Sequence, residues 1–126
     1  MSVVFSILEE HKTVLITMSG QVAREDVEQM RVRTLEIAEE TKFTNFIMDI
    51  SELQSIDRGD GYAVFELGHK FRSTGFSLHT RTAVIMPSDP KARVQVEFLH
   101  TVEINRGRGE LQYVDSIDAG LYWLRS

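Results

Sequence analysis

The sequence contains no cysteine, and its only prolines are Pro87 and Pro90. Without cysteine the chain can form neither a disulfide nor a thiolate metal site, which agrees with a reducing compartment. No apolar run approaches the length of a membrane-spanning helix. Glu9 and Glu10 follow the first apolar residues too soon for a signal peptide. We therefore expect a soluble cytoplasmic protein.

Motifs that mark common catalysts are also missing. The sequence has no G-x-S-x-G elbow and no G-K-[ST] phosphate loop. Gly59 and Gly61 begin like a dinucleotide fingerprint, but the third small residue is absent and neighbouring Asp57 and Asp60 would repel a pyrophosphate. The histidines lack the spacing of zinc ligands; they are His11, His69, His79 and His100. We predict no enzyme activity, no metal and no cofactor.

Positive charge is scarce. Lys and Arg number 14 against 19 Asp and Glu, which gives a net charge of -5. This balance argues against general nucleic-acid binding, since most of its affinity comes from Lys and Arg on phosphates. With 126 residues, 42% hydrophobic and 26% charged, the chain fits one globular domain over residues 1–126.

The first third of the chain reads as two strands and a helix. Apolar alternation predicts strands over 3–8 and 13–18, and the short polar link between them favours an antiparallel hairpin. Ser19-Gly20 is expected to end the second strand. Apolar residues at helical spacing then predict a surface helix over 24–40 that covers the sheet.

A strand-then-helix pattern follows. Residues 46–50 and 82–86 are almost continuously apolar, as in central strands covered on both faces. Ser88 or Asp89 is expected to cap a helix that begins at Pro90 and turns Val94 inward. The other predicted elements are a helix over 62–71, a strand over 111–114 and a terminal helix, capped by Asp115 or Ser116, over 117–124.

The predicted order is therefore β-β-α-β-α-β-α-β-α. Strands that alternate with helices imply a parallel sheet, to which the opening hairpin adds one antiparallel strand. We expect a single α/β domain with a five-stranded, mixed but mostly parallel sheet and about four helices. Asp49 is expected at the rim of this sheet, followed by a polar loop over 51–61.

Three phrases carry a resemblance that covers essentially the whole chain: IMDISELQSID, TAVIMPSDPKAR and GELQYVDSIDAGLYWL. Together they resemble the SpoIIAA-like family. Its structural group is shared by STAS domains, including anti-sigma-factor antagonists, and by Sec14-type (CRAL-TRIO) lipid-binding modules. The phrases are patterns of apolar and turn residues rather than a catalytic signature. The resemblance thus implies a fold more than an activity.

In STAS antagonists the corresponding loop reads D-x-S-x-x-x-x-I-D-S-S-G, and a partner kinase phosphorylates its second late serine. The present chain matches this pattern at four positions but has Arg58 and Gly59 where the two serines would stand. The resemblance therefore implies that the usual phosphoserine switch is absent. Ser51 and Ser55 are nearby hydroxyls that we interpret as turn residues. Asp60 is either a helix cap or a fixed negative charge beside the vacant position.

Two functions remain open. The first is a non-enzymatic regulatory or protein-interaction module that binds a protein partner or a second copy of itself. Tyr62, Phe65 and His69 share one helical stripe, which is a contact surface if exposed and completes the core if buried. The predicted interaction residues are Asp57, Arg58, Gly59, Asp60, Tyr62, Phe65 and His69.

The second function is an apolar or lipid-like ligand site with peripheral membrane contact, as the Sec14 side of the resemblance implies. Phe76 and Leu78 are bordered in sequence by Lys70, Arg72 and Arg81, a pattern that suits an amphipathic ligand with an anionic head. Basic residues scattered on a solvated face are the alternative interpretation.

Overall fold

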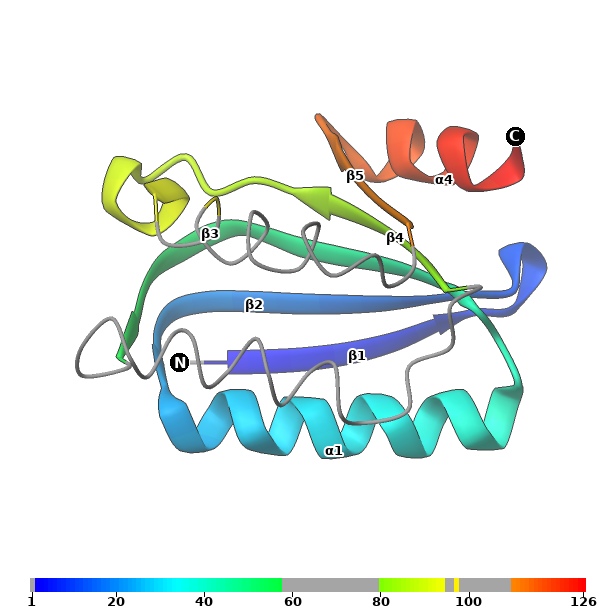
Figure 1. Cartoon of the computed structure of the whole chain (residues 1–126), viewed down its shortest axis with the longest axis horizontal. Helices are drawn as coiled ribbons and strands as arrows, with labels where there is room; N and C mark the ends of the chain where they lie inside the picture. Colours follow the sequence, from blue (N-terminus) through cyan, green and yellow to red (C-terminus); the bar gives the residue numbers. More distant parts are fainter. Residues whose placement is uncertain (1, 58–79, 95–96, 98–109) are drawn as a thin grey trace.

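The computed structural model describes residues 2–57, 80–94, 97 and 110–126 (Figure 1). Five strands form one sheet in the order β1-β2-β3-β4-β5. β1 is antiparallel to β2, and every other neighbouring pair is parallel. The mixed, mostly parallel sheet predicted from the sequence is confirmed. The strands are β1 (Ser2–Leu8), β2 (Thr13–Ala23), β3 (Asn45–Asp57), β4 (Arg81–Ile85) and β5 (Glu110–Val114).

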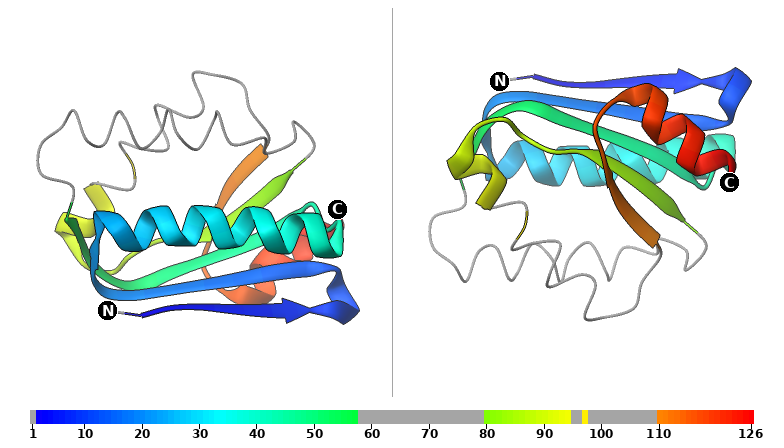
Figure 2. Two further views of the ribbon diagram at one scale, coloured as in Figure 1. Left: turned by 90° about the horizontal axis from the view of Figure 1, so that it is seen from below. Right: turned by 90° about the horizontal axis from the view of Figure 1, so that it is seen from above.

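Helices lie on both faces of the sheet. α1 (Arg24–Thr41) covers one face and α4 (Ile117–Arg125) covers the other (Figure 2). A short 3-10 helix, η1 (Glu9–His11), joins β1 to β2, and residues 90–94 and 97 are also helical. The helix predicted over 62–71 lies outside the described residues.

The opening hairpin forms as the short polar link predicts. Lys12 takes a left-handed conformation with φ of 51°, and its backbone N–H donates to the carbonyl of Glu9 at 3.2 Å. The chain reverses there, and β1 then pairs with β2 without a register shift from Ser2 opposite Ser19 to Leu8 opposite Thr13. The link therefore fixes the register of the antiparallel pair.

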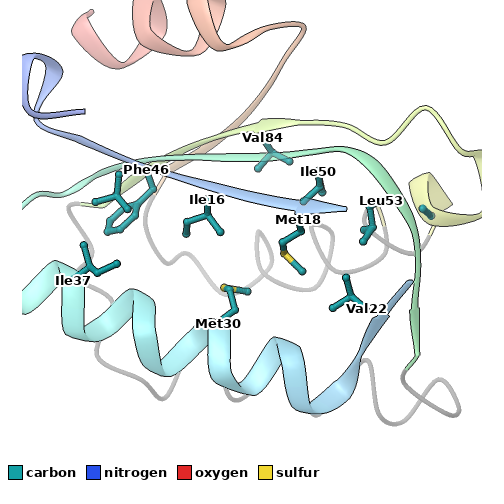
Figure 3. Close-up of a cluster of buried hydrophobic side chains, with 11 residues drawn as sticks. Ile16, Met18, Val22, Met30, Ile37, Phe46, Ile50, Leu53 and Val84 are labelled. Carbon is teal, nitrogen blue, oxygen red and sulfur yellow. The ribbon is translucent and has the colours of Figure 1, made fainter. Parts of the chain in front are cut away.

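Side chains of β2, β3 and β4 enter the core on the α1 side (Figure 3). This follows from the period of two along a strand, which sends successive side chains to opposite faces. The hydroxyl of buried Thr34 is satisfied within α1, where it donates to the carbonyl of Met30 at 2.7 Å. The buried members of this core are Val14, Ile16, Met18, Val22, Met30, Ile37, Phe46, Ile50, Leu53, Val84 and Ala92.

The other alternate set packs under α4. Ile47, Ala83 and Ile85 form this smaller core with Leu124. Of the two residues predicted to cap α4, Ser116 is the cap, since its Oγ accepts the N–H of Ala119 at 3.1 Å.

Arg81 fixes the carboxyl end of α4. Its guanidinium lies 4.3 Å from the centre of the Trp123 ring, and Nη1 donates to the carbonyl of Leu124 at 3.1 Å. A cation is favourable at this end of a helix because the last carbonyls there carry partial negative charge. The first residue of β4 is thereby tied to the last turn of the chain.

Gly120 is a buried residue of α4 that lies close to the sheet, and it supplies a test of that packing. A Cβ at this position would lie 3.2 Å from Cβ of Ala83 and 3.5 Å from side-chain atoms of Ile47 and Val114. We expect Gly120→Val to lower the free energy of unfolding by about 1–3 kcal/mol through overpacking. Urea denaturation measures this change. Ala119→Val, at the exposed neighbouring position, is the control, and an equal effect of both variants would contradict the packing argument.

Candidate functional site

Two strands run further than the sequence predicts. Ser19-Gly20 does not end β2, which continues to Ala23. Residues 51–57 of the predicted polar loop are instead the second half of β3, and residues 58–61 lie outside the described part of the chain. Both predictions are wrong for one reason. Gly20 adopts φ of 74°, and register shifts on either side of it absorb the extra residues of β3, so that pairing continues.

The continued strands form a structure that we call the β2–β3 extension, residues 19–23 of β2 paired with residues 52–57 of β3. Val22 and Leu53 are fully buried and bind this extension to the α1-side core. β4 pairs with β3 only as far as Asp49 opposite Ile85. Among the described residues, the extension is therefore a two-stranded ribbon that ends at Asp57.

Asp49 lies within β3 rather than at the end of a strand. Asp49 is the last residue of β3 that pairs with β4, so it lies at the edge where β4 ends. β3 itself continues to Asp57, so Asp49 is not at the end of its own strand as predicted. Oδ1 of Asp49 accepts two hydrogen bonds from Ser51, from the backbone N–H at 3.1 Å and from Oγ at 2.7 Å. This closed turn accommodates the extra residue of β3 at the first register shift.

Ser55, interpreted from the sequence as a turn residue, is instead paired within β3 opposite Gln21. Ser51 also lies in β3, but its hydrogen bonds to Asp49 close a local turn. Its carbonyl also accepts two hydrogen bonds from Ser88, from the N–H at 3.2 Å and from Oγ at 3.1 Å. These contacts connect the turn after β4 to the bulge of β3. This connection could not be predicted from the sequence, because Ser51 and Ser88 are far apart in the chain and no local motif links them.

The helix after β4 begins as predicted. Oδ1 of Asp89 accepts the N–H groups of Lys91 at 2.9 Å and Ala92 at 3.1 Å, so Asp89 rather than Ser88 is the cap. The inward orientation predicted for Val94 is wrong, since Val94 is 66% exposed. Ala92 is the buried residue of this turn, and a residue two positions further along a helix points to the other side.

Tyr113 of β5 lies near the charged face of this helix. Burial raises the pKa of Tyr113 to about 12, with a further rise from the Glu97 carboxylate and an opposing effect of Arg93. Glu97 and Arg93 themselves form an ion pair, with 3.4 Å between Nε and Oε1. The phenol therefore remains protonated at neutral pH.

The structure describes the position of one predicted interaction residue. Asp57 is the last residue of β3, and the other six predicted residues lie outside the described part of the chain. Arg81 begins β4 opposite Asn45, the first residue of β3, whereas Asp57 is the last residue of that strand. The guanidinium of Arg81 is engaged with α4.

Within the described ranges, no group of three or more His, Asp or Glu side chains is placed to hold a metal ion. In the same ranges, no helix has both the length and the apolar character that crossing a membrane requires.

The sheet order, the opening hairpin and the helices on both faces are those of a SpoIIAA-like, STAS-type fold. The anti-sigma factor antagonist SpoIIAA in its unphosphorylated form superposes with a TM-score of 0.65 and 17% identity, covering 98% of this chain and 96% of that one. The Bacillus cell fate determinant SpoIIAA in its phosphorylated form gives 0.61 and 15%, covering 98% and 100%.

A third solved structure has the same fold. It is an uncharacterised protein of the DUF3478 family from Shewanella loihica PV-4, described as having a SpoIIAA-like fold. Its TM-score is 0.61 at 22% identity, and the match covers 98% of this chain and 92% of that one. No protein-family model and no curated protein sequence matches the chain. At these identities the likeness establishes the fold.

The Asp49 turn supplies a test of how the β2–β3 extension is anchored. We expect Asp49→Ala to lower the free energy of unfolding by about 1–3 kcal/mol, because both hydrogen bonds from Ser51 to the carboxylate are lost. Asp49→Asn keeps a side-chain oxygen that accepts both bonds and should retain most of the stability. Chemical denaturation of the two variants measures the difference. Equal stability of Asp49→Ala and the unmodified chain would show that the turn does not depend on this side chain.

The raised pKa of Tyr113 predicts that the free energy of unfolding decreases in alkali. The unfolded tyrosine ionises near pH 10, whereas the folded one keeps its proton to about pH 12. Its contribution to stability is therefore complete below pH 10 and falls as the pH rises toward 12. We expect Tyr113→Phe to flatten this part of the stability profile, measured by denaturation at a series of pH values. Tyr122→Phe, at a 72% exposed position, is the control, and equal profiles of the two variants would contradict the assignment.

Proposed function

We propose that residues 1–126 form a STAS-type regulatory module that binds another protein through residues 57–69 and catalyses no reaction. The observation that carries this proposal is the whole-chain likeness to SpoIIAA, which is named an anti-sigma factor antagonist and is known in phosphorylated and unphosphorylated forms. A protein with this fold is thus known to act in regulation. The proposal places the module in the cytoplasm.

The anchoring of β3 supports the proposed location. Asp57 is the last residue of the β2–β3 extension and is paired with Ala23. The proposed recognition segment therefore starts directly after a paired strand. The β2–β3 extension is attached to the core by Val22 and Leu53, and its base is attached to the turn after β4 by Ser51 and Ser88. A recognition segment gains precision when rigid elements hold its ends.

The proposed module differs from SpoIIAA in how it is switched. With Arg58 and Gly59 where the STAS pattern has two serines, no hydroxyl is present to accept a phosphate there. Ser51 is engaged as donor to Asp49, which suits a structural role. We propose that binding is independent of phosphorylation at this loop, with Asp60 as a permanent negative charge.

The apolar-ligand alternative has no supporting observation in the described part of the chain. α1 and α4 each pack against apolar residues of the sheet there. Arg81, one of the basic residues invoked for an anionic head group, binds Trp123 and Leu124. We do not advance a lipid-carrier function.

Replacing Tyr62 and Phe65 by alanine tests the proposed interaction. We expect the double variant to lose a protein that co-purifies with the unmodified chain from its own host, because aromatic side chains supply much of the binding energy at interfaces. Quantitative mass spectrometry of the purified complexes measures the loss. Tyr122→Ala, at the exposed tyrosine of α4, is the matched control and should retain the partner.

Thermal melting of each variant separates a loss of binding from a loss of folding. A folded double variant that keeps every partner of the unmodified chain would contradict the proposed site. If the double variant unfolds, Arg58→Glu provides the same test, since a reversed charge in the loop should weaken the complex without removing an apolar side chain.

A further inference from the structure

β1 has an edge without a partner strand among the described residues. It pairs with β2 on one side and is the first strand in the sheet order. At such an edge a row of backbone N–H and C=O groups is available for pairing with another strand. Natural proteins usually block this pairing with lysine, proline, a bulge or a short strand.

None of these protections is present in β1. The strand is seven residues long with the sequence SVVFSIL, which contains neither a charge nor a proline. Its register with β2 is unbroken along the whole length, so no bulge interrupts the edge. Two of its aliphatic side chains are exposed, Val4 at 52% and Ile7 at 42%. β1 is therefore a neutral, regular edge in a chain of net charge -5.

We infer that β1 is a dimerisation edge and that its partner is β1 of a second copy of this chain, paired antiparallel about a two-fold axis at Phe5. This register uses all seven residues, from Ser2 opposite the partner's Leu8 to Leu8 opposite the partner's Ser2. It joins two five-stranded sheets into one continuous sheet. Isologous pairing of this kind closes the assembly at two copies.

The side chains fit this register. Val3 and Phe5 pack against the α1-side core, and Ile7 shares their face because it lies opposite Val14. With Phe5 at the axis, Ile7 of each copy lies opposite Val3 of the other, which covers an exposed aliphatic side chain. Val4 meets Ser6 on the other face.

Charge distinguishes this arrangement from a parallel one. Glu9 and Glu10 follow β1 directly. Antiparallel pairing places these acidic pairs at opposite ends of the joined strands, with the two Glu9 positions roughly 27 Å apart, or eight residues at the usual rise. That separation exceeds the screening length of about 8 Å at physiological salt. Parallel pairing in register would bring the same carboxylates to about 5 Å, where they repel.

The joined edge is small for a permanent dimer. Stable interfaces bury about 1,600 Å², more than a seven-residue strand pair with a few aliphatic side chains supplies. We therefore expect a reversible dimer that dissociates on dilution. The dimer is argued from β1 alone and the proposed function from residues 57–69, so substitutions in one segment test one proposal without changing the other.

Sedimentation velocity of the full chain from about 1 μM to about 1 mM tests the inference, since weak dimers dissociate in that range. We expect a monomer–dimer equilibrium whose dissociation constant rises about tenfold or more in Ile7→Lys. Val32→Lys is the matched control, because it makes the same charge change at a β-branched residue of similar exposure, 45%, on α1. It should dimerise as the unmodified chain does.

Amide hydrogen exchange at low and high concentration provides the second measurement. In the monomer, alternate amides of β1 bind β2 and the others exchange freely; the dimer should protect the second set as well. If Ile7→Lys fails to fold, Val4→Lys replaces it. A monomer at every concentration, equal dissociation constants for the Ile7 and Val32 variants, or β1 amides protected only by a different protein would each overturn the inference.

Discussion

Continuous pairing between β2 and β3 is the constraint on which the rest of the molecule depends. These strands are paired from Thr13 opposite Asn45 to Ala23 opposite Asp57, and they are the longest in the sheet. Because successive side chains of a strand point to opposite faces, this one register decides which residues meet α1 and which meet α4. Ile16 and Phe46 thus enter one core while Ile47 enters the other.

Two register shifts allow β2 and β3 to stay paired beyond the point where β4 ends. Extra residues of β3 are accommodated by the Asp49–Ser51 turn and beside Gly20, and the strand reaches Asp57 without losing β2. Bulges bend strands and increase their twist, and they occur near functional positions. The proposed recognition segment therefore starts from a point set by the sheet. The backbone N–H and the hydroxyl of Ser88, in the turn after β4, hold the same place by hydrogen bonds to the carbonyl of Ser51.

For each of the two capped helices the cap could be narrowed to two neighbouring residues, of which the hydrogen bonds select Asp89 and Ser116. The order of the five strands, α1 and α4 along the chain and the mixed sheet could be predicted from the sequence, because local spacing determines them. The length of β2 and β3 could not, because Gly20 and the polar residues after Ile50 look like breaks unless the partner strand is known. Val22 continues the even-numbered alternation of Val14, Ile16 and Met18, and this pattern was the available sign that β2 continues past Gly20. The inward orientation of Val94 was wrong for another reason: the smaller Ala92 occupies the buried side of that turn, and Val94 points the other way. At the candidate site, the turn role of Ser51 was predictable from local chemistry, whereas its partner Ser88 was not.

The stacking of Arg81 on Trp123 has a consequence for how unfolding is observed. Trp123 is the only tryptophan of the chain, so intrinsic indole emission reports on a single location, the contact between the last helix and the first residue of β4. The larger core on the opposite face contributes nothing to that signal, whereas α1 dominates the helical circular dichroism of the described residues. A comparison of the two spectroscopic transitions therefore reveals whether the two hydrophobic layers melt as one cooperative unit or in succession.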